Sequence, residues 1–329
     1  MKGGIGYKLL YGCTYAVSLL PYSLLYVLSD VFYLLVYYVV GYRKKVVRKN
    51  LSTSFPEKEK QELRKIEKKF YHWLCDYFVE TLKLLSVSDA TLLKHIEFRN
   101  VEALEQCFDD GQACAAMLGH YGNWELLSAT ALSLTRWKES NNEHKSAVMG
   151  LIYHPLRNKV FDQLFIQLRQ RKQGTCIPKK DILRYLAKYR KEQRMSLFGY
   201  IADQNPKWEN IHLWLPFLNH DTPVFTGAER IIRKMNNAVF YVEMERPQRG
   251  KYVCTFRLMT REPGKLEEYA LTHQFFQMLE ETIQRAPQYY LWTHNRWKRT
   301  HEEFQRRSKD EGGRTMDSLR EGESTKEKS

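Results

Sequence analysis

The sequence predicts an α/β domain with a largely parallel central sheet flanked by helices, and an apolar helix at its N-terminal end. Short apolar runs alternate along the chain with longer segments whose apolar residues recur at helical spacing. This alternation is typical of a parallel sheet covered by helices. The chain has 329 residues, 43% of them hydrophobic and 27% charged, which excludes a disordered or fibrous protein. Its mean hydropathy of −0.55 excludes a polytopic transporter.

The first element is an apolar segment between two groups of basic residues. From Leu9 to Tyr42 the only charged residue is Asp30, and the cluster Arg43–Lys49 follows. The segment is too long and too rich in tyrosine for a cleaved signal peptide. We therefore predict a membrane-anchoring segment over residues 1–42, with the chain after it in the cytoplasm by the positive-inside rule.

The way in which this segment meets the membrane is open from sequence. Pro21 and Asp30 divide it, so a single span, an interfacial helical hairpin and a buried apolar helix all fit its composition.

The remaining elements follow from apolar periodicity. Residues 57–86 predict an amphipathic helix, residues 113–118 a strand, and residues 123–134 a second helix after a glycine-containing loop. Four further strands are predicted over 147–152, 196–201, 238–243 and 252–259. Four further helices are predicted over 158–171, 182–191, 226–235 and 271–285. No interdomain linker is evident, so residues 43–305 are predicted to form one domain, followed by a disordered charged tail over 306–329.

Charge and cysteine content limit the classes of partner. Lys and Arg total 52 against 38 Asp and Glu, a formal charge of +14, which favours nucleic acid, anionic lipid, phosphorylated glycolipid or an acidic protein. The six cysteines form no C-x-x-C pair and no compact cluster with histidine. We therefore predict free thiols, with no disulfide framework and no zinc site.

A candidate catalytic pair lies in the loop after the strand at 113–118. His120 and Glu125 are separated by four residues, and Gly119 and Gly122 lie beside the histidine. A histidine oriented by a carboxylate is a suitable general base for removing a proton from a hydroxyl. The same residues also fit a loop histidine with ordinary solvent contacts. No phosphate-binding P-loop, nucleophile-elbow or zincin motif is found.

The segment His120-Tyr121-Gly122-Asn123-Trp124-Glu125 resembles the H-x4-D/E block of the glycerolipid and lysophospholipid acyltransferase superfamily. Within that superfamily it is most similar to the lipid A late acyltransferase branch, in which H-x-G-N-W-E is characteristic. The resemblance covers about residues 9–300 and includes ordered blocks on both sides of the histidine. These blocks are 42–51 with 55–56, 153–162 with Arg169, 202–206 with 215–217, and 287–298.

The resemblance implies a glycerolipid-acyltransferase-like fold and acyl transfer at the cytoplasmic face of the inner membrane. The donor would be acyl carrier protein, and the acceptor a hydroxyl of a lipid A precursor, giving an acyloxyacyl group of lipopolysaccharide. His120 would act as general base and Glu125 would orient it, with no covalent enzyme intermediate. The family chemistry implies no metal and no cofactor.

The resemblance also suggests substrate-binding residues. Arg169 matches a family arginine suited to a phosphate or to developing negative charge, and Asp203 matches a family acid after the strand at 196–201. Asn123 and Trp124 lie inside the catalytic block. The alternatives are a salt bridge on a basic helix for Arg169 and a turn or helix-capping role for Asp203.

Two rival functions fit parts of the sequence. The same base and thioester would serve another lipid acceptor, such as a glycerophospholipid, an amino-acid lipid or a mannosylated lipid. A non-enzymatic basic protein that binds nucleic acid or a membrane surface would explain the charge of +14 but not the His120 block. The family resemblance implies no nucleic acid partner.

Overall fold

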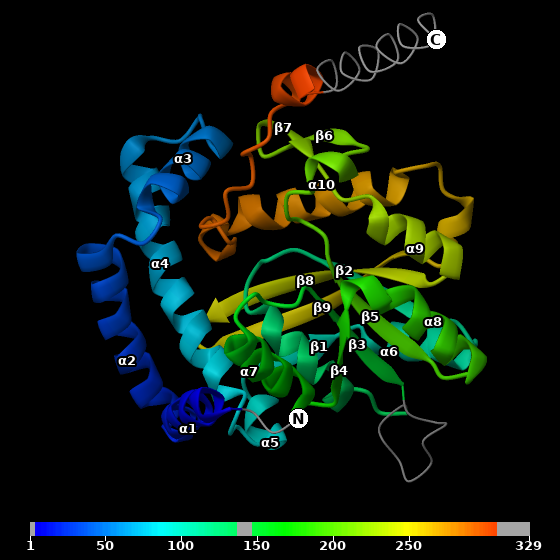
Figure 1. Cartoon of the computed structure of the whole chain (residues 1–329), viewed down its shortest axis with the longest axis horizontal. Helices are drawn as coiled ribbons and strands as arrows, with labels where there is room; N and C mark the ends of the chain where they lie inside the picture. Colours follow the sequence, from blue (N-terminus) through cyan, green and yellow to red (C-terminus); the bar gives the residue numbers. More distant parts are fainter. Residues whose placement is uncertain (1–3, 137–146, 308–329) are drawn as a thin grey trace, which may run out of the picture.

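The computed structural model describes residues 4–136 and 147–307 of the chain. Its centre is a seven-stranded sheet with the order β1-β9-β8-β2-β5-β3-β4 (Figure 1). Neighbouring strands are parallel except β8 and β9, which form an antiparallel hairpin. The largely parallel sheet predicted from sequence is therefore confirmed. The strands are β1 Ile96–Arg99, β2 Cys114–Leu118, β3 Val148–Tyr153, β4 Gly174–Pro178, β5 Ser196–Ile201, β8 Ala238–Gln248 and β9 Lys251–Thr260.

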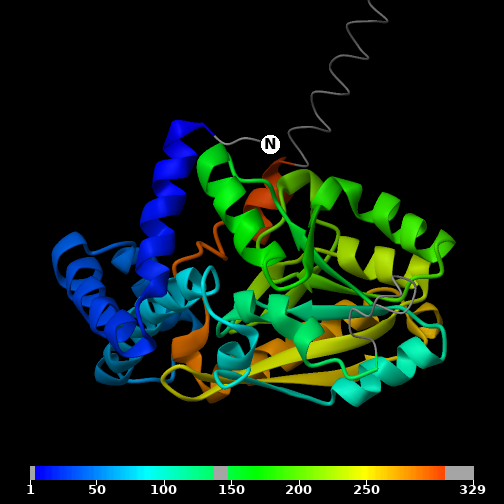
Figure 2. The ribbon, with the colours of Figure 1, turned by 90° about the horizontal axis from the view of Figure 1, so that it is seen from below.

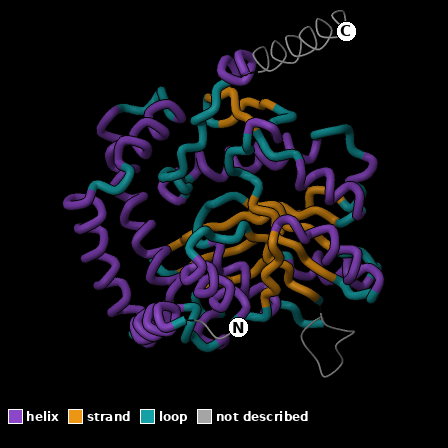
Figure 3. The backbone as a smooth tube through the Cα atoms, viewed as in Figure 1, coloured by secondary structure: helices purple, strands orange, loops and turns teal. Residues whose placement is uncertain are grey.

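Helices cover the sheet above and below in Figure 1, and Figure 3 shows the loops that join them to the strands. Helix α10 packs on β2 and β8, α6 packs on β2 and β9, and α7 and α8 pack on β4. Because both sides are covered, β2 is buried over its whole length. These helices are α5 Asp89–Leu92, α6 Val101–Asp109, η2 Trp124–Leu132, α7 Lys159–Gln170, α8 Ile182–Lys191, α9 Gly227–Met235 and α10 Ala270–Arg285.

A small antiparallel hairpin and several short 3₁₀ turns complete the α/β region. Strand β6 of the hairpin packs against α10, away from the main sheet. The hairpin strands are β6 Trp214–Phe217 and β7 His220–Pro223, and the turns are η4 Lys179–Asp181, η5 Trp208–Asn210, η6 Pro263–Lys265 and η7 Pro287–Tyr289.

The N-terminal helices form a layer at the left edge of Figure 1. Helix α2 continues into the π-helix η1 and lies along α4, and α1 packs against both α4 and α7. Among the described residues, one segment is long and apolar enough to cross a membrane, Tyr22–Val40. The elements of this layer are α1 Ile5–Leu19, α2 Tyr22–Leu34, η1 Leu35–Val40, α3 Lys44–Ser54 and α4 Lys60–Lys83.

Most predicted elements are confirmed within a few residues, and the differences have local causes. The helix after the His120 loop is a 3₁₀ helix, in which Ser128 and Thr130 donate hydroxyl hydrogen bonds to carbonyls three residues back. Strand β4 was not predicted; it ends in Pro178 at the edge of the sheet, where a missing N–H is tolerated. The strand β1, the helix α6 and the β6–β7 hairpin were also not predicted.

The structure also bears on the cysteines and on the start of the C-terminal tail. All six cysteines are free, as predicted. The predicted disordered tail over 306–329 lies outside the described residues from position 308 onward. Its first two residues end a short helix over 301–307.

Candidate active site at the carboxyl ends of β2 and β5

The register of two neighbouring strands brings a histidine and an aspartate together. In the parallel pair β2 and β5, Leu118 lies opposite Ile201, and each is the last residue of its strand. His120 and Asp203 each follow two residues later, in the loops shown in teal in Figure 3. The carboxyl ends of parallel strands are where α/β proteins place their ligands.

His120 is held by two hydrogen bonds to Asp203. Its Nδ1 lies 2.6 Å from Oδ1 of Asp203, and its backbone N–H donates to Oδ2 at 3.0 Å. The His120 side chain is 15% exposed and that of Asp203 is 3% exposed. The carboxylate thus fixes both the ring and the backbone of the histidine.

The charge of Asp203 determines the tautomer of His120. Burial alone would raise the pKa of the Asp203 carboxyl, but the His120 charge, the hydrogen bonds from His120 and the charge of Arg296 together lower it. An ionised carboxylate only accepts hydrogen bonds, so Nδ1 of His120 carries a hydrogen. In the neutral ring Nε2 is then an acceptor, as a general base requires.

The expected contact between Glu125 and His120 is corrected by the structure, because Asp203 occupies Nδ1. Glu125 instead accepts from Nε and Nη2 of Arg169, at 2.7 and 2.6 Å. Both carboxylate oxygens are therefore engaged in a two-pronged salt bridge. This bridge joins η2 to α7, and the carboxylate that contacts Nδ1 of His120 is that of Asp203.

In the Glu125–Arg169 pair the glutamate is buried and the arginine is partly exposed. The Glu125 side chain is 3% exposed and that of Arg169 is 21% exposed. Burial alone would lower the pKa of Arg169, but the charge and hydrogen bonds of Glu125 raise it. Arg169 stays cationic, and its Nη1 makes no hydrogen bond within the parts of the chain that the structure describes.

The loop around His120 approaches its neighbours closely because it contains glycine at two positions. A Cβ on Gly119 would lie 2.7 Å from the Leu279 side chain, and one on Gly122 would lie 2.5 Å from Met244. Gly122 also has a φ of +58°, a conformation that side-chain-bearing residues rarely adopt. Larger residues at these positions would push the loop away from β8 and α10.

The last of the family-like blocks, residues 287–298, which we call the C-terminal block, holds the same loop through backbone hydrogen bonds. The N–H of Gly122 donates to the carbonyl of Tyr289 at 2.9 Å, and the N–H of Leu291 donates to the carbonyl of His120 at 3.1 Å. Tyr121 and Tyr290 form an antiparallel bridge. This contact explains why the two blocks, about 170 residues apart in the chain, belong to one site.

A cavity of about 680 Å³ opens in front of the histidine. Its walls come from the ends of β2, β3 and β5 and from η2, α7 and α9. The lining is mostly apolar, with polar groups that include His120, Glu125, Arg169, Lys179 and Gln204. An apolar cavity of this size with a few convergent polar groups suits an elongated, largely apolar ligand.

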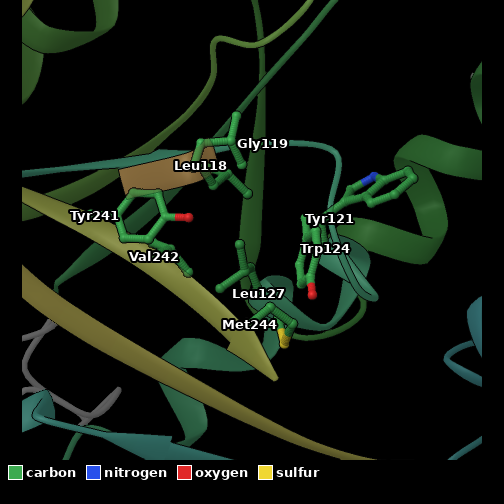
Figure 4. A pocket seen from close by; sticks show the side chains of 9 residues that line it. Leu118, Gly119, Tyr121, Trp124, Leu127, Tyr241, Val242 and Met244 are labelled. Carbon is green, nitrogen blue, oxygen red and sulfur yellow. The ribbon is translucent and has the colours of Figure 1, made fainter. Parts of the chain in front are cut away.

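A much smaller void lies behind the loop and shares Leu118, Trp124 and Leu127 with the large cavity (Figure 4). Figure 4 shows Tyr241 and Val242 from β8 on its other side. Its volume of about 10 Å³ is roughly that of one water-sized probe. The loop is therefore packed tightly on β8, and the cavity of about 680 Å³ lies on its other side.

The structure separates the two other predicted residues of the catalytic block. Trp124 lines the cavity, with its ring edge-on to the His120 ring at 5.0 Å between centroids. Asn123 is fully buried and donates to Oε2 of Glu80 at 3.0 Å. The cavity lining does not include Asn123 or Asp203. Their contacts indicate that they position the loop and the histidine.

Sequence reasoning missed two residues of this site. Nε2 of Gln204 lies 3.2 Å from Nε2 of His120 and lines the cavity. Arg296 is buried, and burial lowers its pKa to about 10 against the opposing influence of Tyr290 and Asp203. Both residues belong to the blocks quoted for the family resemblance, at 202–206 and 287–298, which was the only available signal for them.

Within residues 4–136 and 147–307, no group of three or more histidine, cysteine or acidic side chains is placed to hold a metal ion. The absence of a metal and of a cofactor stays a prediction from the family resemblance.

Nearly the whole chain also matches the sequence model of a known family. The sequence model for bacterial lipid A biosynthesis acyltransferases matches residues 5–299. The match includes the His120 loop, the loop after β5 and the C-terminal block. No curated protein matches the chain.

Proposed function

Because the chain belongs to the bacterial lipid A biosynthesis acyltransferase family, we propose that it moves a fatty acyl chain from acyl carrier protein to a hydroxyl of a lipid A precursor. The chain is an acyltransferase by membership of that family. We place the reaction at the cytoplasmic face of the inner membrane, with His120 as the base.

The observation that carries the mechanism is the orientation of His120. Asp203 engages Nδ1, and the ring borders the apolar cavity with Nε2 on the side of Gln204. In the proposed reaction Nε2 takes the proton of the acceptor hydroxyl while its oxygen attacks the thioester carbonyl. The carbon–sulfur bond then breaks, and the carrier thiol leaves with the proton that His120 returns from Nε2, so no acyl-enzyme forms.

Asp203 stabilises the imidazolium that forms when His120 accepts the proton. The depressed pKa of its carboxyl keeps it ionised at neutral pH, and an anion next to an imidazolium favours the charged ring. This is the role that sequence reasoning gave to Glu125. In the present proposal Glu125 holds Arg169 at the cavity wall.

Arg169 is proposed to meet negative charge on the substrates. It lines the cavity, and its Nη1 makes no hydrogen bond to the described residues. A guanidinium with a spare donor suits a phosphate of the acceptor or the oxyanion that develops during acyl transfer. The cavity itself is proposed to hold the acyl chain, because its lining is mostly apolar.

The test is mass spectrometry of lipid A and total lipids from the source bacterium after deletion of the gene. The deletion is complemented with wild type, with His120→Ala, or with His212→Ala as a matched control at an exposed histidine. Lipid A should lose one acyl chain, and wild type and His212→Ala should restore it while His120→Ala should not.

Two results would contradict parts of the proposal. Loss of an acyl group from a glycerophospholipid, an amino-acid lipid or a mannosylated lipid, with lipid A unchanged, would replace the acceptor and keep the chemistry. Restoration by His120→Ala would remove the proposed base.

A further inference from the structure

The apolar N-terminal segment is attached to the globular domain at both of its ends. At its start, Nζ of Lys83 donates to the carbonyls of Ser18 and Leu20, both at 2.8 Å. At its end, the Tyr71 hydroxyl donates to the carbonyl of Tyr42 at 2.5 Å. The segment Tyr22–Val40 is thus bound to the same helix, α4, before and after its apolar stretch.

The middle of the segment is also attached, through charged side chains that meet at the buried Asp76. Arg249, in the turn between β8 and β9, bridges Asp30 of α2 and Asp76 of α4, at 2.7 and 2.6 Å. Ser29 of α2 donates to Asp76 at 2.6 Å. Arg246 pairs with the other oxygen of Asp76 at 2.7 Å. We call Asp30, Asp76, Glu80, Arg246 and Arg249 the anchor cluster.

These attachments are incompatible with an upright transmembrane helix. Nineteen helical residues extend about 28 Å, so an upright helix would place its two ends on opposite sides of the hydrocarbon layer. Helix α4 lies alongside and would have to enter the bilayer with it. It carries charged residues from Lys60 to Lys83, and each costs roughly 3 kcal/mol at the bilayer centre.

The outer face of α1, α2 and η1 is nevertheless apolar. Along Ile5–Val40 the only charged residues are Lys8 and Asp30, and Asp30 is paired. The exposed apolar side chains of this face are Ile5, Leu9, Leu19, Leu24, Val27, Val31, Phe32, Leu34, Leu35, Tyr38, Val39 and Val40. Exposed basic residues follow at once, among them Arg43, Lys45 and Lys49, so the charge next to the apolar face complements anionic lipid headgroups.

We infer that α1, α2 and η1 lie in the plane of a lipid bilayer surface, with their outer face in the lipid and both ends on the same side as the catalytic domain. The inference rests on the proposed use of a membrane lipid as acceptor. The apolar face would then contact the bilayer, and the protein would be monotopic, inserted in one leaflet only.

This arrangement places the active-site cavity next to the lipid. Figures 1 and 2 both show α1 beside α7, and Tyr7 of α1 forms a hydrogen bond with Gln167 of α7. The opposite side of α7 lines the cavity with Phe165 and Arg169. An acceptor lipid would therefore reach His120 from the leaflet in which α1 lies.

The first experiment measures which side of the membrane each end occupies. In a full-length Cys13→Ser background, which removes the exposed native thiol, Lys8→Cys and Lys45→Cys are treated with a membrane-impermeant maleimide. In intact spheroplasts both should be protected, and in inside-out vesicles both should react. Labelling of Lys8→Cys in intact spheroplasts, with Lys45→Cys protected, would show a spanning helix and overturn the inference.

The second experiment measures lipid binding by flotation of the full chain with vesicles of phosphatidylethanolamine and phosphatidylglycerol. Val27→Glu/Val39→Glu should lower the partition coefficient at least about tenfold, because both side chains face outward. Leu258→Glu, at an exposed leucine of β9, is the matched control and should float as wild type does. Unchanged flotation of the double variant, or its conversion from an oligomer to a monomer without a change in flotation, would overturn the inference. Neither experiment needs enzymatic activity, so its failure is distinguishable from failure of the proposed reaction.

Discussion

The His120–Asp203 pair and the anchor cluster each contain a buried carboxylate paired with a nitrogen-bearing side chain. They differ in whether a member of the pair borders a cavity. In the anchor cluster, every oxygen of Asp76 and Glu80 accepts a hydrogen bond from the protein, including those from Tyr252 and Asn123 to Glu80. In the catalytic pair, Nδ1 of His120 is engaged and the ring borders a cavity of about 680 Å³. Burial of charge is common to both, so the open side of the histidine is what distinguishes chemistry from anchoring.

Burial raises the pKa of both Asp203 and Glu80, and the two carboxyls differ in whether their contacts outweigh it. Asp203 has a depressed pKa because its contacts with His120 outweigh burial, whereas burial raises the pKa of Glu80 in spite of Arg246 and its hydrogen bonds. A functional anion next to the histidine must stay charged, and the first environment ensures this. The environment of Glu80 has no such requirement, and within the same cluster the contacts of Asp76 with Arg246, Arg249 and Ser29 lower its pKa against burial.

Asp203→Asn should give the largest effect on catalysis and is the strongest test of the comparison. Asparagine keeps the size of the side chain but not the charge that fixes the tautomer of His120 and stabilises the imidazolium. We expect kcat to fall about 10²–10⁴-fold, with KM nearly unchanged, in a steady-state assay with acyl carrier protein as donor. A kcat within a few-fold of wild type would remove Asp203 from the mechanism.

The candidate site was partly predictable from sequence. The strands that end before His120 and Asp203 were both predicted, at 113–118 and 196–201. Their adjacency was not, because two other strands, β3 and β4, lie between them in the chain and β5 inserts between β2 and β3 in the sheet. Proximity in sequence therefore favoured Glu125 as the partner, while the sheet order brings Asp203 to His120.

Asp76→Asn should have the opposite pattern, with a large effect on stability and little effect on catalysis. The substitution leaves Arg246 and Arg249 without their shared carboxylate, and Arg246 is 7% exposed. Removal of one partner from a buried ion pair costs about 3–5 kcal/mol of unfolding free energy. We expect that loss in urea unfolding, with kcat of the folded fraction close to wild type. A fall in kcat like that of Asp203→Asn would show that the anchor cluster takes part in catalysis.

The fold was more predictable than the anchor cluster. Apolar periodicity identifies the strands and helices that are buried on one or both faces, such as β5 and α8. It cannot identify ion pairs across distant elements, because Asp30, Asp76 and Arg249 lie on three segments separated by up to 219 positions. The apolar segment was recognised from sequence. Its attachment to α4 depends on Asp30, a residue that sequence composition indicates only as an interruption of a membrane helix.

Glu125 and Arg169 form an intermediate case, which a double-mutant cycle can place in one region or the other. Glu125→Gln and Arg169→Met should each cost about 2–3 kcal/mol, less than a fully buried pair because Arg169 is partly exposed. The double variant should recover part of that stability, since neither partner is left unpaired. If Arg169 also meets substrate, kcat/KM of the double variant stays as low as that of Arg169→Met. Recovery of kcat/KM together with stability would assign the pair to the scaffold alone.

Glu80→Gln should give the smallest effect, visible as a change in pH dependence. Because burial raises the pKa of Glu80, the folded state binds its proton more tightly than the unfolded state. Wild-type stability from this group is present below the ordinary carboxyl pKa and is lost as pH rises through the raised value. Glutamine does not titrate, so the difference in unfolding free energy between Glu80→Gln and wild type should shift in favour of the variant as pH rises through that window. Urea unfolding across this pH range measures the shift, with Glu102→Gln at an exposed position of α6 as control. A difference independent of pH would mean that Arg246 and the hydrogen bonds to Glu80 already balance its burial, as the contacts of Asp203 do at the catalytic histidine.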